Sequence, residues 1–288
     1  MPGTMALEKK ITIATLNKHK ADGEKFSMLT CYDATMASIQ QAAGVEVILV
    51  GDSLAGPVLG LPDTTGVGLE VSMTLTAAVR RGAPLAYLVA DMPYLTYTSP
   101  AQAVANGGRY VTEARADCVK LECDRRFVDT VAAMATAGIS VMPHLGLTPQ
   151  RAGQVGGYKV AGKTAAGAIQ IIETAEMMVE AGASALLLEA VPPEPARMLT
   201  ERVSVPVIGC GAGAGCDGHV IVTHDMIGLV PGRVPKFVKK YTDLATPMQK
   251  AFEAYVAECR DGTYPAPEHA YPMSDEELEA LRQWAKES

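Results

Sequence analysis

Residues 45–53 read VEVILVGDS, a short apolar run that ends in an acidic residue, Asp52. Four later runs repeat the pattern, each with an ionisable residue at its end: LAYLVAD at Asp91, CVKLE at Glu122, SVMPH at His144 and ALLLE at Glu189. Continuous runs of Val, Ile, Leu and Ala are typical of strands that are buried on both faces, and the stretches between these runs have the length of ordinary helices. The pattern therefore predicts parallel strands joined by helical crossovers.

The number of such runs predicts an α/β fold of the (β/α)8 TIM-barrel class, which uses about 250 residues. A chain of 288 residues that is 48% hydrophobic can form one such barrel, so we expect a single domain over residues 1–288. Residues 1–10 are expected to form an N-terminal tail. Residues from about 236 to 288 are expected to form extra helices that pack on the barrel or on a neighbouring subunit. The eight strands are expected at 28–33, 45–52, 85–93, 118–122, 140–146, 185–192, 205–213 and 226–230.

Composition and charge argue against several classes of function. The net charge of −7 and the pI near 5.3 argue against nucleic acid as a partner, because no stripe of Lys and Arg is visible. The one basic cluster, Lys236, Lys239 and Lys240, is expected on a solvated helix face. No run approaches the ~18 apolar residues of a membrane span, and MPGTMALEKK lacks the layout of a signal peptide, so we expect a cytoplasmic protein. The six cysteines form no C-x-x-C pair, which favours free thiols.

Asp52, Asp91 and Glu122 are expected to lie close together, because the carboxyl ends of parallel barrel strands meet at one rim. They offer only oxygen ligands, which selects a hard ion such as Mg²⁺ over Zn²⁺. A single carboxylate at a strand end is more often a cap or an ion-pair partner, but three at equivalent positions favour a metal or acid–base site. Lys120 lies two residues before Glu122 and points the same way. A buried Lys needs a partner, either a carboxylate or an anionic substrate.

Glu189 is the strongest candidate for a general base. It follows the apolar residues ALLL, and a carboxylate partly removed from water there would take up a proton more readily. The alternative is a strand-end Glu in a salt bridge. His144 could donate a hydrogen bond to a ligand, although a lone His in a strand is more often a core or rim residue. The run GCGAGAGCDG at 209–218 departs from G-x-G-x-x-G at Ala214, and close backbone packing explains its glycines as well as a phosphate site would.

In order and spacing, several blocks of the sequence resemble the ketopantoate hydroxymethyltransferase family: MLTCYDA, VILVGDSL, ADMPY, VKLE, HLGLTPQ, GGYKVAGKT, LLLEAVP and VPVIGCGAG. The blocks run from about residue 11 to residue 270, and GDS, HLGLTPQ and GGYKV together are highly specific. The resemblance implies a TIM barrel of the phosphoenolpyruvate mutase and isocitrate lyase type, assembled as a large homo-oligomer such as a decamer. It also implies transfer of a hydroxymethyl group from 5,10-methylenetetrahydrofolate to 3-methyl-2-oxobutanoate, which yields 2-dehydropantoate for pantothenate and coenzyme A synthesis.

The same resemblance implies roles for individual residues, carried over by motif. Asp52 and Asp91 would bind Mg²⁺, and Glu122 would bind it directly or through a water molecule. Ser53 and Lys120 would hold the 2-oxo acid, with Asp52, Asp91 and His144 also around it. Glu189 would accept the proton that leaves the substrate.

The chain departs from the family's pattern beside these positions. Ala55 follows GDSL where a glycine is common, Leu75 stands where a histidine is usual, and Cys123 and Asp124 stand where two small residues are usual. The altered residues 55–75 leave open a second interpretation, a diverged aldolase or lyase of the same barrel that acts on another 2-oxo acid or on a free aldehyde. A third interpretation, a catalytically silent assembly protein, would need the loss of one of the carboxylates or of Lys120, and all are present.

Overall fold

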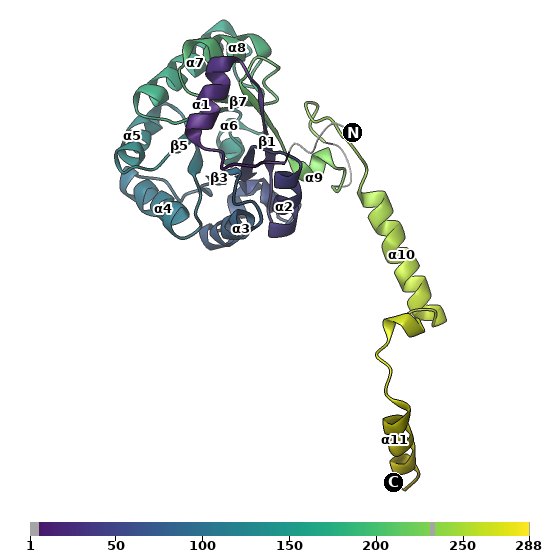
Figure 1. The fold of residues 1–288 in the computed structure, drawn as a ribbon. Helices are drawn as coiled ribbons and strands as arrows, with labels where there is room; N and C mark the ends of the chain where they lie inside the picture. Colours follow the sequence, from purple (N-terminus) through teal and green to yellow (C-terminus); the bar gives the residue numbers. More distant parts are fainter. Residues whose placement is uncertain (1–5, 231–233, 288) are drawn as a thin grey trace. The chain divides into compact units, whose positions relative to one another are not determined.

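The computed structural model describes residues 6–230 and 234–287 of the chain. Its centre is a closed barrel of parallel strands, in which each strand pairs with the next and the last pairs with the first (Figure 1). The strands are β1 (Phe26–Thr30), β2 (Val47–Val50), β3 (Tyr87–Asp91), β4 (Cys118–Glu122), β5 (Val141–Gly146), β6 (Leu186–Glu189), β7 (Val207–Cys210) and β8 (Gly218–Ile221). The predicted α/β TIM-barrel class is confirmed.

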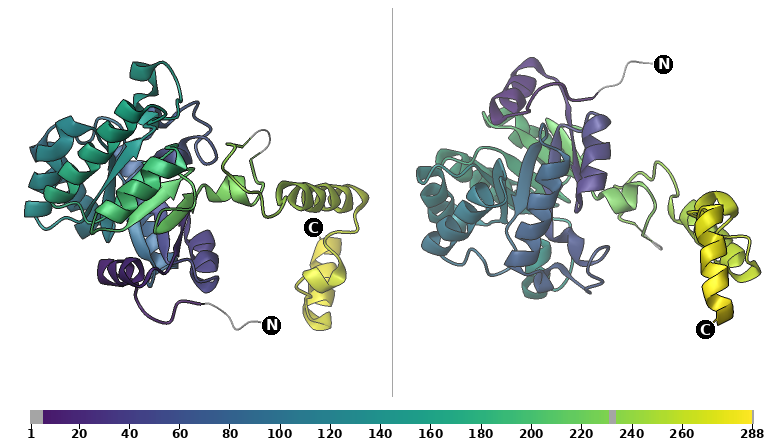
Figure 2. Two further views of the ribbon diagram at one scale, coloured as in Figure 1. Left: turned by 90° about the horizontal axis from the view of Figure 1, so that it is seen from above. Right: turned by 60° about the horizontal axis from the view of Figure 1, so that its bottom comes forward.

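Helices alternate with the strands and surround the barrel (Figures 1 and 2). They are α1 (Ile13–Asp22), α2 (Ala34–Ala42), α3 (Leu69–Gly82), α4 (Pro100–Thr112), α5 (Val128–Thr136), α6 (Ala152–Val155), α7 (Ala165–Glu180), α8 (Pro193–Arg202) and α9 (Thr223–Met226). Ser99 caps α4, since its side chain accepts a hydrogen bond from the backbone N–H of Gln102 and Pro100 occupies the first helical position. The loop after β2 contains two 3₁₀ turns, η1 (Asp52–Ala55) and η2 (Thr64–Gly66).

The interior of the barrel is filled with apolar side chains. Met28, Leu49, Met142 and Leu187 point into it and are each at most 5% exposed. Because these side chains fill the interior, it is a packed core and not a pore. Full burial of a side chain of this size contributes about 1.5–3 kcal/mol to the stability of the fold. Leu16 of α1 joins this core and is fully buried, because α1 lies across one end of the barrel (Figures 1 and 2).

The eighth strand is Gly218–Ile221, so the prediction of a strand at residues 226–230 is wrong. Residue Met226 ends the short helix α9, and Gly228 has a left-handed backbone with φ of 67°, which a strand does not allow. The true strand reads GHVI, and its glycine and histidine break the continuous apolar run that identifies the other strands in the sequence. Gly218 is needed there, because a Cβ at this position would lie 2.3 Å from the Phe26 ring of β1.

The chain divides into two compact units, one that ends at Tyr241 and one that spans Thr242–Ser288. The second unit contains η5 (Pro267–His269) and the helices α10 (Ala245–Asp261) and α11 (Asp275–Glu287). The packing of these helices on the barrel or on another subunit stays a prediction. Within the described residues, every helix is too short or too polar to cross a membrane.

Lys236, Lys239 and Lys240 do not lie on a helix face, which corrects the prediction for this basic cluster. The segment that carries them is irregular, and α10 starts only at Ala245. The reason is a contact with the end of α9: the backbone N–H of Tyr241 donates to the carbonyl of Met226 at 2.8 Å, which holds the segment out of helical geometry. Lys239 instead places its Nζ 4.7 Å from the centre of the Tyr241 ring.

The space around two helical glycines predicts opposite effects of substitution: Gly82 lies where α3 contacts α2, and Gly108 lies on α4. A Cβ at Gly82 would lie 2.1 Å from the carbonyl oxygen of Ala34, whereas a Cβ at Gly108 would meet no atom within 4 Å. Gly82→Ala should therefore lower the free energy of unfolding by about 3 kcal/mol, and the matched Gly108→Ala should raise it by roughly 0.5–1 kcal/mol. Urea denaturation of both variants measures the two values. Equal effects would show that the backbones of α2 and α3 are free to separate.

Candidate active site

The predicted site residues come together at the carboxyl ends of the strands. A cavity of about 160 Å³ opens there, and its lining includes all seven of them: Asp52, Ser53, Asp91, Lys120, Glu122, His144 and Glu189. They belong to five consecutive strands, β2 to β6, or to the residues directly after them. Parallel pairing brings them to one rim, as the strand-end pattern predicts.

Asp91 and Lys120 form a buried ion pair. They are neighbours in the β3–β4 register, and Lys120 Nζ lies 2.9 Å from Asp91 Oδ1, with both side chains at most 5% exposed. Burial alone would lower the pKa of Lys120, but the carboxylates of Asp91 and Asp52 raise that pKa above its ordinary value. Lys120 is therefore a fixed positive charge inside the cavity. The second oxygen of Asp91 accepts a hydrogen bond from the backbone N–H of Asp52 at 3.1 Å.

Glu122 is fully buried next to this pair. Its two oxygens each accept a hydrogen bond of 3.1 Å from the backbone N–H of Gln150. Burial raises the pKa of Glu122 to about 9, against the opposing attraction of Lys120. In the absence of a metal ion, Glu122 thus holds a proton at neutral pH.

His144 connects the ion pair to Glu189. Its Nδ1 lies 3.2 Å from Lys120 Nζ, and its Nε2 lies 3.3 Å from Glu189 Oε2. Burial, followed by the charge of Lys120, lowers the pKa of His144 below its ordinary value, so the ring is neutral at neutral pH. Because an ammonium group can only donate, we assign Nδ1 as the acceptor, which places the ring hydrogen on Nε2. Nε2 faces Glu189 but makes no hydrogen bond within the described part of the chain. A line of close polar contacts therefore runs from Asp91 through Lys120 and His144 to Glu189.

Glu189 is more accessible than the other acids of this chain. Its side chain is 20% exposed, compared with 1% for Asp91 and 1% for Glu122. The backbone around it is closely constrained: its carbonyl accepts from the N–H of Leu147 at 2.8 Å, and a Cβ at Gly146 would lie 2.3 Å from that carbonyl oxygen. The next residue, Ala190, has a left-handed backbone with φ of 48°, which is rare for a residue with a Cβ.

Gln150 and Tyr32 are part of the site but were not predicted. The Gln150 side chain donates to Asp52 Oδ2 at 2.9 Å and to the carbonyl of Met92 at 3.1 Å, and it accepts a hydrogen bond from the Tyr97 hydroxyl. The Tyr32 hydroxyl lies 2.8 Å from Ser53 Oγ. Periodicity does not reveal either residue, because Gln150 belongs to the loop after β5 and Tyr32 follows β1. The block HLGLTPQ, which ends at Gln150, was the available signal.

The carboxylates suit Mg²⁺ by their chemistry. Within residues 6–230 and 234–287, no three His, Cys, Asp or Glu side chains converge closely enough to hold a metal ion. Asp52 instead faces the Gln150 amide, and Asp91 faces Lys120. Mg²⁺ usually keeps several water molecules and needs only one or two carboxylates, so oxygen donors along a common wall are sufficient. The donor set therefore fits this ion by its chemistry.

The buried state of Glu122 predicts a pH-dependent stability. The folded, metal-free protein keeps this proton up to about pH 9, whereas the unfolded chain loses it near the ordinary pKa of a Glu. Folding takes up a proton between these two values, so stability should fall as pH rises, by up to about 1.4 kcal/mol per pH unit. Glu122→Gln should reduce this dependence, leaving the part that comes from Asp91, whose pKa burial raises to about 7, and the exposed control Glu180→Gln should keep it in full. Urea denaturation with a chelator from about pH 5 to about pH 9 measures it; parallel curves for wild type and Glu122→Gln would contradict the expectation.

Comparisons with known proteins agree with this geometry. The model of the family described as ketopantoate hydroxymethyltransferase matches residues 10–267. The 3-methyl-2-oxobutanoate hydroxymethyltransferase of Enterococcus faecalis is 45% identical over 273 residues, which is 94% of this chain and 99% of that protein. The protein of the same name from Syntrophus aciditrophicus is 45% identical over 269 residues, with 93% and 99% covered.

Two solved structures share the fold at low sequence identity. Phosphonopyruvate hydrolase superposes with a TM-score of 0.62 at 15% identity over 96% of both chains. A 2,3-dimethylmalate lyase, described as a member of the PEP mutase/isocitrate lyase superfamily, superposes with a TM-score of 0.57 at 16% identity over 98% of this chain and 99% of that one. These two structures confirm the barrel fold and show the fold alone.

Proposed function

The chain belongs to the ketopantoate hydroxymethyltransferase family, and we propose that it transfers a hydroxymethyl group from 5,10-methylenetetrahydrofolate to 3-methyl-2-oxobutanoate. The product would be 2-dehydropantoate, a step of pantothenate biosynthesis. One observation carries the mechanism: a single cavity joins a fixed cation, a set of carboxylates and a more accessible Glu. Proton abstraction next to a carbonyl needs these three elements.

The cavity fits a small, branched 2-oxo acid. Its volume of about 160 Å³ is below the range of about 300–1,000 Å³ typical of drug-sized ligands, so it suits a metabolite of a few heavy atoms. Lys120 supplies a positive charge for the anionic substrate, and Ser53 supplies a hydroxyl that is held in place by Tyr32. Leu187 and Val220 line the same cavity with apolar carbon, which a branched substituent at C3 would contact.

Mg²⁺ would be held by Asp52 and Asp91, with Glu122 as a direct ligand or a ligand through water. When bound, the ion supplies positive charge near the keto and carboxylate oxygens of the substrate, which makes the C3 proton more acidic. Gln150 contacts both Asp52 and the carboxylate of Glu122, and so holds these two acids at a fixed separation.

Glu189 is the proposed base for the C3 proton. His144 Nε2 lies 3.3 Å from one of its oxygens, and the other oxygen is left for the substrate. A positioned base contributes roughly 10²–10⁴-fold, about 3–5 kcal/mol, so the negative charge that develops on the keto oxygen also needs stabilisation, which Lys120 provides. C3 and the oxygen of a water molecule then each form a bond to the one-carbon unit, and both bonds from that carbon to the two folate nitrogens break. The proton taken from C3 and one proton of the water end on these two nitrogens, which gives 2-dehydropantoate and tetrahydrofolate.

Glu189→Gln should separate catalysis from binding. Exchange of the C3 proton of 3-methyl-2-oxobutanoate with deuterated water should fall by about 10²–10⁴-fold, while the affinity for the 2-oxo acid changes only a few-fold. Proton NMR follows the exchange, and calorimetry gives the affinity. The exposed control Glu194→Gln on α8 should behave as wild type. Full exchange in Glu189→Gln would exclude Glu189 as the base.

A diverged aldolase or lyase is the second candidate, because the altered residues 55–75 reach the cavity. Thr64 of η2 is part of the cavity lining, so this loop contacts whatever binds there. A panel of 2-oxo acids assayed with methylenetetrahydrofolate and, separately, with formaldehyde distinguishes the two functions. We expect folate-dependent turnover that is highest with the branched five-carbon acid and that stops when a chelator removes Mg²⁺. Comparable turnover with formaldehyde alone would favour the aldolase, and absence of 2-oxo acid binding would revive the silent protein. The homo-oligomer and the cytoplasmic location stay predictions.

A further inference from the structure

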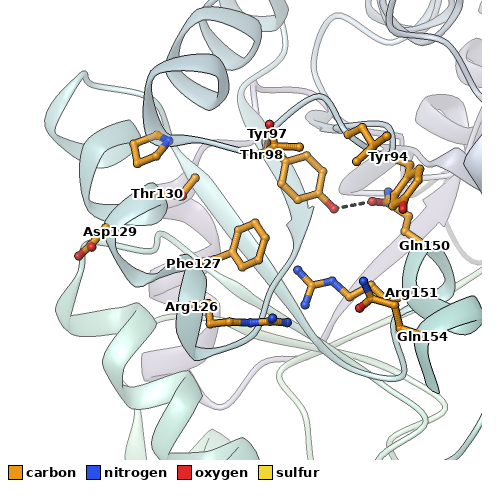
Figure 3. A pocket seen from close by; sticks show the side chains of 12 residues that line it. Tyr94, Tyr97, Thr98, Arg126, Phe127, Asp129, Thr130, Gln150, Arg151 and Gln154 are labelled. Atoms are coloured by element: carbon orange, nitrogen blue, oxygen red, sulfur yellow. Dashed lines mark hydrogen bonds between the residues drawn. The ribbon is translucent and has the colours of Figure 1, made fainter.

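A second cavity lies beside the active site and has no part in the mechanism above. It has a volume of about 420 Å³ and is formed by the loops after β3, β4 and β5 (Figure 3). Aromatic rings and guanidinium groups dominate its walls: Tyr94, Tyr97, Phe127, Arg126 and Arg151. This combination differs from the acidic lining of the first cavity.

The aromatic side of this cavity is pre-arranged. The rings of Tyr97 and Phe127 have centroids 5.8 Å apart and meet edge to face at 63°. Arg151 Cζ lies 4.6 Å from the centroid of the Phe127 ring, a cation–π contact that fixes both side chains. Tyr94 remains 36% exposed at the wall, so part of its ring is available to a ligand.

The charged side of the cavity carries two guanidinium groups. Arg126 and Arg151 both pair with the carboxylate of Asp124, whose pKa is held far below its usual range by these hydrogen bonds. Two guanidinium groups thus share one carboxylate. Asp129, the acid among the lining residues, points away from the cavity in Figure 3. An anionic group that enters would compete with Asp124 for the N–H groups of the two arginines.

Gln150 is the partition between the two cavities. Its side-chain oxygen accepts from the Tyr97 hydroxyl on one side (Figure 3), and its nitrogen donates to Asp52 on the other. A ligand in the second cavity would therefore lie one side chain away from the acid that is proposed to bind Mg²⁺. At the rim, Leu95 is 59% exposed and has a left-handed backbone with φ of 63°. An exposed apolar residue in a strained conformation is typical of a binding loop.

Resting on the proposed function, we infer that this second cavity binds the aromatic amide and carboxylate end of the folate co-substrate. The active-site cavity of about 160 Å³ is too small for a folate, so most of the donor must lie outside it. The benzoyl-glutamate half of a folate has a flat ring, an amide and carboxylates. The second cavity presents aromatic faces, the Gln154 amide and guanidinium groups in the loops next to the site.

The probe for this inference is 4-aminobenzoyl-L-glutamate, which carries the ring, the amide and the carboxylates but no one-carbon unit. Calorimetry on the full chain should detect its binding, and Arg126→Met and Tyr94→Ala should each weaken it about tenfold. Both residues are exposed, so neither change should disturb folding. The matched control is Arg125→Met, because Arg125 is an exposed neighbour outside the lining; it should stay within about twofold of wild type.

Steady-state kinetics give a second readout. In Arg126→Met and Tyr94→Ala, KM for methylenetetrahydrofolate should rise about tenfold, whereas KM for the 2-oxo acid and kcat should be unchanged. Absence of probe binding to wild type, or equal binding to Arg126→Met and Arg125→Met, would overturn the inference while leaving the hydroxymethyl transfer intact. Failure of wild type to use methylenetetrahydrofolate would instead defeat the proposed function. The inference, which rests on that function, would fall with it.

Discussion

The ion pair between Asp91 and Lys120 is the interaction on which the rest of the site depends. A charge on either side chain alone would be costly at this depth, because each is at most 5% exposed. Together they allow one cation and several acids to share a small cavity. Lys120 also affects its neighbour His144, since it helps to keep this ring neutral and places the ring hydrogen on Nε2, which faces Glu189. The proposed base is thus linked to the ion pair through His144.

The fold and most of the site could be predicted from the sequence for one physical reason. A strand that is buried on both faces must be apolar along its length, so the first ionisable residue marks its end, and the closed barrel gathers these ends at one rim. Asp91, Glu122 and Glu189 each end a strand, and Asp52 follows one closely. Their convergence follows from topology and does not require knowledge of any side-chain contact.

The parts that escaped prediction have no such periodic signal. Gln150 belongs to a loop, and its importance arises from partners that lie 28 and 98 positions away, Glu122 and Asp52. The strand Gly218–Ile221 is short, and the need for glycine at its first position becomes clear only from the contact of Gly218 with the Phe26 ring. The basic segment at Lys236 has the composition of an amphipathic helix but is held open by the backbone bond between Tyr241 and Met226. In each case a long-range contact overrides the local pattern.

The helix α1 affects how water and small molecules reach the site. Leu16 plugs the end of the barrel opposite the acids, and the interior behind it is packed with Met28, Met142 and Leu187. Among the described residues, this packing separates the acids from solvent at that end of the barrel and leaves them open to it at the rim. A ligand bound at the rim would also separate the proposed base from water. The order in which ligands arrive and leave would then decide whether an abstracted proton returns to carbon or passes to solvent.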